Sequence, residues 1–195
     1  IHAWAGILKE FLDSLGQKAD MNAVFTAMFQ TALQGEKDGG GLMLYNYLSG
    51  EPVAGLSDGR PLLVRTPGAK MNFANFMRVQ LYGALSTLKL GLDILAGENV
   101  VVEKLMGHGG FFKTPLVGQK IMAAAAGAPV AVMKTAGEGG PWGMALLAAY
   151  RAEHTPGQTL EDFLQTCVFA DAASKTLAPD PAGVAGFARY FERYC

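Results

Sequence analysis

The feature that most constrains the fold is a strand, a glycine-rich loop and a helix that follow one another twice. Asn99–Met106 is rich in Val and Leu and predicts a strand. Gly107-His108-Gly109-Gly110 follows at once, and a helix is predicted from Pro115 to Ala126. The second set consists of a strand at Val130–Met133, a glycine segment at 136–140 and a helix at 141–151. This alternation favours an α/β architecture with parallel strands joined by crossovers.

Most of the remaining sequence has the apolar spacing of three and four that is typical of helices. The longest such segment, Asn72–Ala96, contains Gly83 and Gly91. A glycine inside a helix costs about 1 kcal/mol relative to Ala, so we expect both to pack closely against a neighbour. The other predicted elements are helices at 4–15, 23–32, 160–168 and 184–194, short strands at 42–48 and 62–64, and a loop at 49–61.

Composition excludes several classes of protein. Half of the 195 residues are apolar and 17% are charged, which is typical of a globular chain and not of a disordered one. The formal charge of -1 and the lack of a basic stripe argue against nucleic acid as a partner. The apolar run Ile121–Met133 contains Pro129 and is too short to span a membrane. Two cysteines, Cys167 and Cys195, make no disulfide framework and favour a cytoplasmic protein.

The chain begins directly in a helical pattern. Ile1 is followed within three residues by Trp4, the first apolar position of that pattern, and no capping residue precedes it. A helix without a start signal is typical of a chain entered midway. We therefore expect a fragment of a larger protein, with ordinary processing as the alternative.

The first glycine loop is the primary candidate for a ligand contact. Ligands of open α/β sheets lie beyond the carboxyl ends of strands, and a backbone without side chains approaches a nucleotide closely. Thr114 is expected to cap the helix that opens at Pro115, where free N–H groups attract anions. Phe112 occupies a glycine position of both the dinucleotide fingerprint and the phosphate-binding loop, so neither motif is complete. A turn without a ligand is the remaining alternative.

Several segments together resemble one family, the FGGY carbohydrate kinases, in their C-terminal domain. Their joint order and spacing, from Gly41 to Ala148, are more specific than any one of them. Within the long helix, Arg78 and Gly83 resemble the family's pattern, whereas Tyr82 replaces its Glu. The resembling segments are Gly107–Thr114 with Gly118-Gln119 and Pro129-Val130, Thr135–Ala148 and Tyr47–Glu51.

The resemblance implies an α/β domain of the ribonuclease H-like (actin-like ATPase) class, incomplete, with a mixed sheet and flanking helices. Residues 1–195 would be the C-terminal, nucleotide-binding domain of an ATP-dependent, Mg²⁺-requiring kinase, most like the xylulokinase-type pentulose kinases. The expected ligands are ATP or ADP and a sugar, which an N-terminal domain would mainly bind. The expected protein partner is a second copy of the chain, in a homodimer. The alternatives are a kinase for ribulose, glycerol or gluconate, and a non-catalytic α/β binding or oligomerisation domain.

The resemblance also implies which residues meet the nucleotide. Gly41 matches a glycine before a strand that approaches it, Gly110 matches the glycine at the adenosine end, and Thr114 stands where relatives often have Asn. The full set is Gly41, His108, Gly109, Gly110, Phe111 and Thr114. No catalytic residue is expected in this chain, because the family's base is an Asp of the N-terminal domain. No metal site is expected either, because the three histidines lack ligand spacing.

Overall fold

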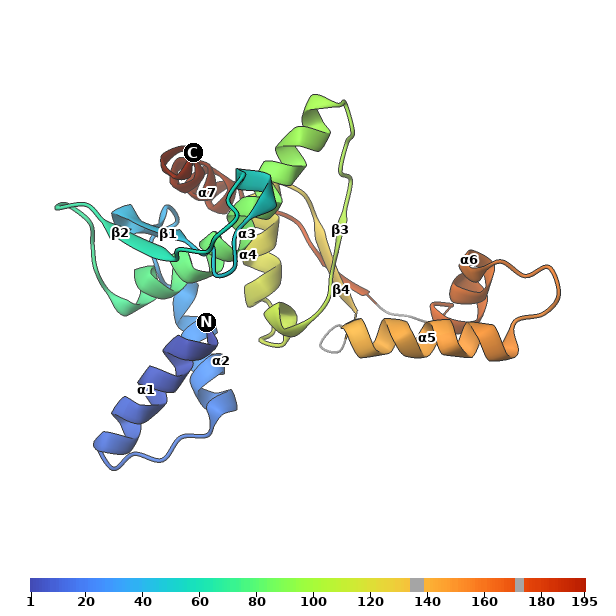
Figure 1. Ribbon diagram of the computed structural model, residues 1–195, viewed down its shortest axis with the longest axis horizontal. Helices are drawn as coiled ribbons and strands as arrows, with labels where there is room; N and C mark the ends of the chain where they lie inside the picture. The colour runs from blue at the N-terminus through green and yellow to red at the C-terminus, as the bar shows by residue number, and fades with distance from the viewer. Residues whose placement is uncertain (134–138, 171–173) are drawn as a thin grey trace.

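The strands form two small sheets in the computed structural model (Figure 1). The structure describes residues 1–133, 139–170 and 174–195. β1 (Leu42–Tyr45) and β2 (Leu62–Arg65) pair antiparallel. In the second sheet, β4 (Val130–Met133) pairs parallel with β3 (Leu105–Gly107) and antiparallel with β5 (Ser174–Leu177). The second sheet is therefore mixed, as expected.

Helices make up most of the described chain, and local side-chain caps explain where several of them begin. Asp20 accepts a hydrogen bond from the Ala23 amide at 2.8 Å, and Asn72 accepts one from the Asn75 amide at 2.8 Å. The helices are α1 His2–Ser14, α2 Met21–Ala32, α3 Phe73–Gly97, α4 Val117–Ala126, α5 Gly139–Glu153, α6 Leu160–Phe163 and α7 Pro181–Tyr194. A π-helical turn at Leu164–Val168 extends α6. Among the described helices none is long and apolar enough to cross a membrane.

The core lies where α2, α3, α4 and α7 surround β1. Tyr82 of α3 is fully buried against Phe187 of α7, with ring centroids 4.9 Å apart. A side chain at Gly83 would come within 3.0 Å of Leu44, so the predicted close packing at this glycine is confirmed. The prediction is wrong at Gly91, where a Cβ would meet no described atom within 4 Å.

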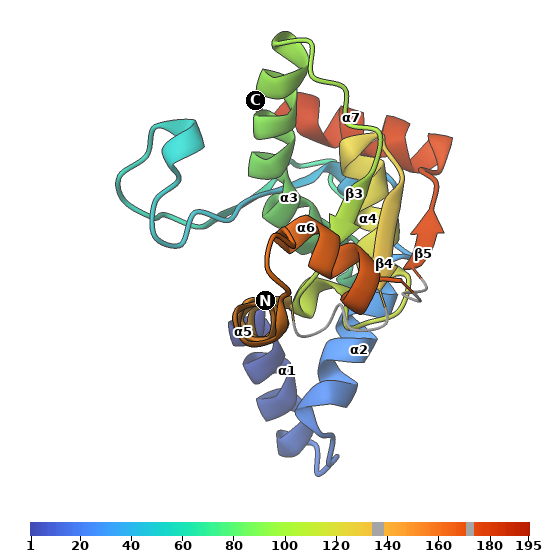
Figure 2. The same cartoon turned by 90° about the vertical axis from the view of Figure 1, so that its right-hand side faces the viewer.

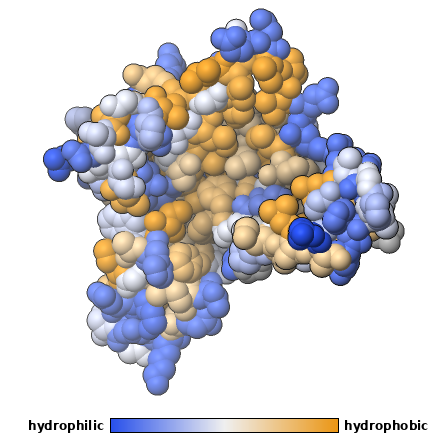
Figure 3. All heavy atoms as spheres, turned by 45° about the vertical axis from the view of Figure 1, so that its right-hand side comes forward, coloured by the Kyte–Doolittle hydropathy of each residue, from blue (hydrophilic) through white to orange (hydrophobic). Residues whose placement is uncertain are grey.

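Two helical pairs project from this core. Figure 1 shows α1 and α2 extending to one side and α5 and α6 to another, and Figure 2 shows α7 beside α3 and α4 at the centre. In Figure 3, apolar side chains gather in the hollow between these projections.

The predicted strand at 99–106 is largely wrong, because only its end pairs with a neighbour. Leu105 lies opposite Val130, which is the first residue of β4, so the residues before Leu105 have no partner in that ladder. The Val100 amide instead donates to the Leu95 carbonyl at the end of α3, and Val101 is 82% exposed. A β-branched run forms a strand only where a neighbouring strand accepts it.

Two other predictions need correction, and one strand was missed. The strand expected at 42–48 ends at Tyr45. β5 was not predicted, because three of its four residues are exposed and give no alternating pattern. Thr114 does not cap a helix: α4 begins at Val117 after Leu116, whose backbone has a positive φ of 66°. The single 3₁₀ turn at 110–112 places a bend between the glycine loop and the helix, which moves the helix start along the chain.

Candidate functional site

The glycine loop leaves its backbone uncovered at the carboxyl end of β3. Gly109 has a φ of +90°, which disfavours any residue with a side chain. A Cβ at Gly109 or at Gly110 would meet no described atom within 4 Å. Gly107 differs, because the ring of Phe112 lies directly against it. The fold therefore requires the first glycine for packing, whereas it leaves open space beside the other two.

Two aromatic residues hold the loop in place. The ring of Phe111 packs edge-on against Phe29 of α2, with centroids 6.1 Å apart, and its carbonyl oxygen lies close to Gly118 of α4. The Phe112 ring packs against Phe111 at 5.5 Å. Both rings are partly buried. They fix the loop between α2 and α4, so that the open glycines keep one position relative to the sheet.

Two cavities meet at the segment that follows the glycines. The larger, of about 530 Å³, lies between Gly110 and the face of α2 that carries Phe25 and Phe29. The smaller, of about 430 Å³, lies over the ends of β4 and β5. Lys113 and Thr114 line both. Cavities of about 300–1,000 Å³ are the size of ligand sites.

Gln119 is a buried polar residue beside the smaller cavity to which sequence reasoning gave no role. Its side-chain amide donates to the carbonyl of Val130 at 3.1 Å and to that of Lys175 at 2.7 Å. It thereby fastens α4 to β4 and β5. A glutamine within an otherwise apolar helical face was the signal that could have identified it.

The structure brings some of the predicted residues together and separates one. Gly110 and Thr114 line the same cavity, and Gly109 lies directly before them. His108 is exposed, and Phe111 is partly buried and packs against the apolar core. Gly41 is outside the residues that line either cavity, in the turn before β1, where a Cβ would lie 3.2 Å from Ala69. Of the second glycine segment, 136–138 lies outside the described residues.

The described residues do not fit a Mg²⁺ ion. No group of three histidine, cysteine or acidic side chains gathers anywhere in the described ranges. Carboxylates are also absent from the described linings of both cavities. Because Mg²⁺ is bound through carboxylates and phosphate oxygens, these residues alone do not hold it.

Comparison with known families shows which family the chain belongs to. The family model for the C-terminal domain of the FGGY family of carbohydrate kinases matches residues 2–152. The chain belongs to this family. No curated protein matches the sequence significantly. In this FGGY chain, the matched range includes α1 to α4, both sheets' strands up to β4, and nearly all of α5.

Solved structures of kinases share the fold of this FGGY chain. A gluconate kinase from Lactobacillus acidophilus is 21% identical, with a TM-score of 0.65 over 86% of this chain and 32% of its own. A ligand-bound xylulose kinase from the same organism is 20% identical, with a TM-score of 0.68 over 97% of this chain and 36% of its own. A glycerol kinase from Plasmodium falciparum, solved with ADP, is 16% identical, with a TM-score of 0.59 over 97% of this chain and 36% of its own. The fold class is thus that of the actin-like ATPases, and this chain spans about a third of each neighbour's length.

Proposed function

We propose that this chain is the nucleotide-binding part of an ATP-dependent sugar kinase. The observation that carries the proposal is the uncovered backbone at Gly109 and Gly110, next to cavities of ligand size. Side-chain packing does not account for these two glycines. The positive φ accounts for Gly109, and close approach of a ligand to the backbone accounts for Gly110.

The position of the loop supports a nucleotide as the ligand. It follows the carboxyl end of β3, which is where open α/β sheets bind their ligands. Backbone N–H groups of such a bend can donate to phosphate oxygens, and the Thr114 hydroxyl can contact the ribose or base. His108, Phe111 and Gly41 belong to the proposed set through the family resemblance. The neighbouring glycerol kinase was solved with ADP, which agrees with this assignment.

We expect another part of the kinase to remove the proton from the sugar hydroxyl. In-line transfer of the γ-phosphoryl group needs a base at the sugar hydroxyl, and the described linings of the two cavities contain no carboxylate. We therefore expect this chain alone to form no ADP from ATP and D-xylulose. The apolar hollow of Figure 3 supports a role as one domain that packs against another. Xylulose is the proposed sugar, with gluconate and glycerol as the alternatives that the neighbours raise.

Titration calorimetry of the 195-residue chain with ADP tests the nucleotide site. Gly110→Val fills the open space beside the loop, so we expect it to abolish ADP binding without unfolding the chain. Gly68→Val is the matched control, because Gly68 also has no described atom within 4 Å of its Cβ position but lies in the turn between β2 and α3. Equal ADP binding by both variants would contradict the proposal, as would a folded wild-type chain that binds no ADP.

A further inference from the structure

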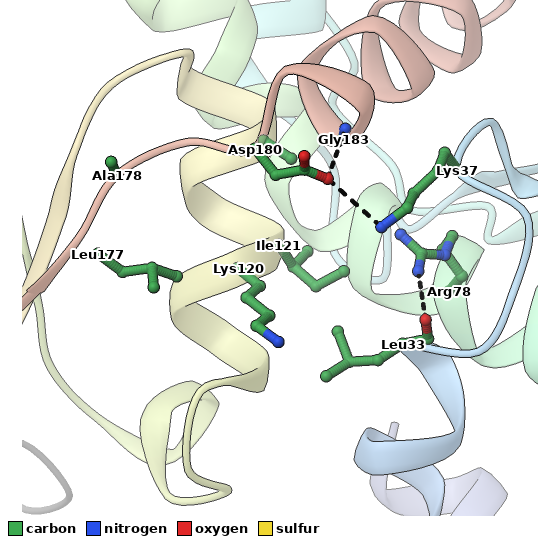
Figure 4. Close-up of a pocket in the computed structure, with 10 residues that line it drawn as sticks. Leu33, Lys37, Arg78, Lys120, Ile121, Leu177, Ala178, Asp180 and Gly183 are labelled. Carbon is green, nitrogen blue, oxygen red and sulfur yellow. Dashed lines mark hydrogen bonds and ion pairs between the residues drawn. The ribbon is translucent and has the colours of Figure 1, made fainter.

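A third cavity, of about 230 Å³, lies at the opposite end of the second sheet from the glycine loop (Figure 4). Leu177 lines it and pairs with Val130, the first residue of β4. The cavity beside Thr114 is lined instead by Met133 and Ser174, which pair at the other end of the same ladder. The third cavity is therefore separate from the proposed nucleotide site.

Arg78 lines this cavity with a buried guanidinium group that has no acidic partner among the residues that the structure describes. The residue is only 2% exposed. Its Nη1 donates to the Tyr82 hydroxyl at 3.0 Å and its Nη2 to the Leu33 carbonyl at 3.1 Å, and both acceptors are neutral. Its Nε has no partner among the described residues. A buried cation without a counter-charge is costly, so this arrangement favours an anion nearby.

The other charges around the cavity leave it positive. Lys37 and Lys120 line it together with Arg78, and Asp180 is the single carboxylate of the described lining. Asp180 is engaged by two other residues of the lining: Oδ2 lies 3.5 Å from Lys37 Nζ and accepts a hydrogen bond from the Gly183 amide at 3.1 Å. Within the described ranges, Lys120 forms no ion pair.

A second acidic residue near this region is also engaged. Asp38 is close enough to Tyr82 to raise the pKa of its phenol, although burial is the larger cause of that rise. The Asp38 carboxylate lies 3.5 Å from Arg193 Nη1, and Asp38 is not part of the cavity lining. It therefore does not supply the missing counter-charge of Arg78.

We propose that this cavity binds a small oxyanion, a phosphate or a carboxylate group, between Arg78 and Lys120. The planar guanidinium group still has free N–H groups at Nε, Nη1 and Nη2, and such groups match the geometry of oxyanions. Figure 4 shows the side chains of Arg78, Lys37 and Lys120 around one space. Ile121 and Leu177 form an apolar wall, which strengthens electrostatic attraction there. The volume suits a small anion and is too small for a nucleotide.

Phosphate titration of the 195-residue chain tests the site without nucleotide or sugar. At matched ionic strength in chloride, we expect phosphate to raise the melting temperature and to shift the ¹⁵N–¹H signal of Arg78 Nε. Lys120→Ala removes an exposed cation and should weaken phosphate binding about tenfold, the effect of one charge-assisted contact. Lys18→Ala, in the turn between α1 and α2, makes the same change of charge away from the cavity and should bind phosphate as the wild type does.

Two further variants keep the test decisive. Arg78→Lys retains the charge but loses the planar group, so we expect weaker phosphate binding if it folds; if it does not fold, Lys120→Ala and the Arg78 Nε signal decide. Butyrate in place of phosphate shows whether the site prefers carboxylates. An unshifted Arg78 signal, or unchanged binding by Lys120→Ala, overturns the proposal. Loss of phosphate binding in Lys113→Ala alone also overturns it, by placing the anion at the glycine loop, and leaves the proposed nucleotide site intact.

Discussion

Two glycine-rich turns of this chain look alike in sequence and differ in what surrounds them. At Gly39–Gly41 all three residues have positive φ, and each is enclosed. A Cβ on the first would lie 2.6 Å from Val79 Cγ1, one on the second would overlap Asn75, and one on the third would lie 3.2 Å from Ala69. Packing thus explains every glycine of the first turn.

The second turn, Gly107–Gly110, is enclosed only at its first residue. Gly109 and Gly110 face open space, and the fold does not need Gly110 for its φ, since only Gly109 has a positive value there. Open space alone does not mark a ligand site, because Gly68 and Gly91 are equally open. At Gly110 the support for the proposed ligand comes from the ligand-sized cavities beside the loop. The comparison therefore separates a turn whose glycines packing explains from a turn beside which we propose a ligand.

The largest expected effect is at the enclosed turn. Gly40→Ala adds a side chain at a φ of +62° and overlaps Asn75, whose amide is held by hydrogen bonds to the Glu36 amide at 2.7 Å and the Lys70 carbonyl at 2.9 Å. We expect a loss of about 4 kcal/mol of stability from backbone strain and overpacking together. Urea unfolding followed by circular dichroism measures it.

Gly127→Ala is the matched control for that change. Gly127 ends α4 at a φ of +66°, and a Cβ there would meet no described atom within 4 Å. It should cost about 1 kcal/mol, the backbone strain alone. If Gly40→Ala lowers the free energy of unfolding by no more than Gly127→Ala does, packing does not require glycine in the first turn.

Alkaline pH should lower the free energy of unfolding through Tyr190, which packs beside the same turn. Burial raises the pKa of Tyr190 to about 12, and its ring lies 3.5 Å from the Cβ position of Gly39. The unfolded phenol releases its proton near pH 10 and the folded one near pH 12, so stability is complete below pH 10 and falls as the pH rises between these values. The loss should reach about 3 kcal/mol.

Urea unfolding of the wild type and of Tyr190→Phe between pH 8 and 12 measures this loss. The variant is expected to start less stable, because it lacks the hydrogen bonds of the Tyr190 hydroxyl with the Leu44 amide and carbonyl. Its stability should fall less steeply with pH. A residual slope is expected from Tyr82, Tyr45 and Tyr194, whose pKa values burial also raises. Identical slopes in both proteins would contradict the buried position of Tyr190.

The smallest effect on stability is expected at the open turn. Gly110→Ala adds a methyl group to empty space and should change the free energy of unfolding by less than about 0.5 kcal/mol. The same urea experiment measures it beside Gly40→Ala. A loss as large as that of Gly40→Ala would mean that the second turn is structural too, and would remove the main support for a ligand there.

The sequence predicted the elements whose signals are local. The long helix was expected at 72–96 and is found at Phe73–Gly97, because its apolar period and the Asn72 cap both lie within the segment itself. β4 was likewise predicted at Val130–Met133 and is found at those residues. Glycines after a strand marked the candidate loop, and family resemblance pointed to a nucleotide.

Tertiary structure decided what depends on distant residues. The segment 99–104 reads as a strand, yet the ladder with β4 begins only at Leu105. β5 forms because β4 offers it an edge. Within the described part of the chain, Arg78 has no acidic partner because the neighbouring elements bring only neutral acceptors to it. Local sequence patterns determine which residues form turns and which form helices. Whether a glycine is enclosed depends on residues that are distant in the sequence. Only the tertiary structure therefore distinguishes Gly40, which is tightly packed, from Gly110, which has open space beside it.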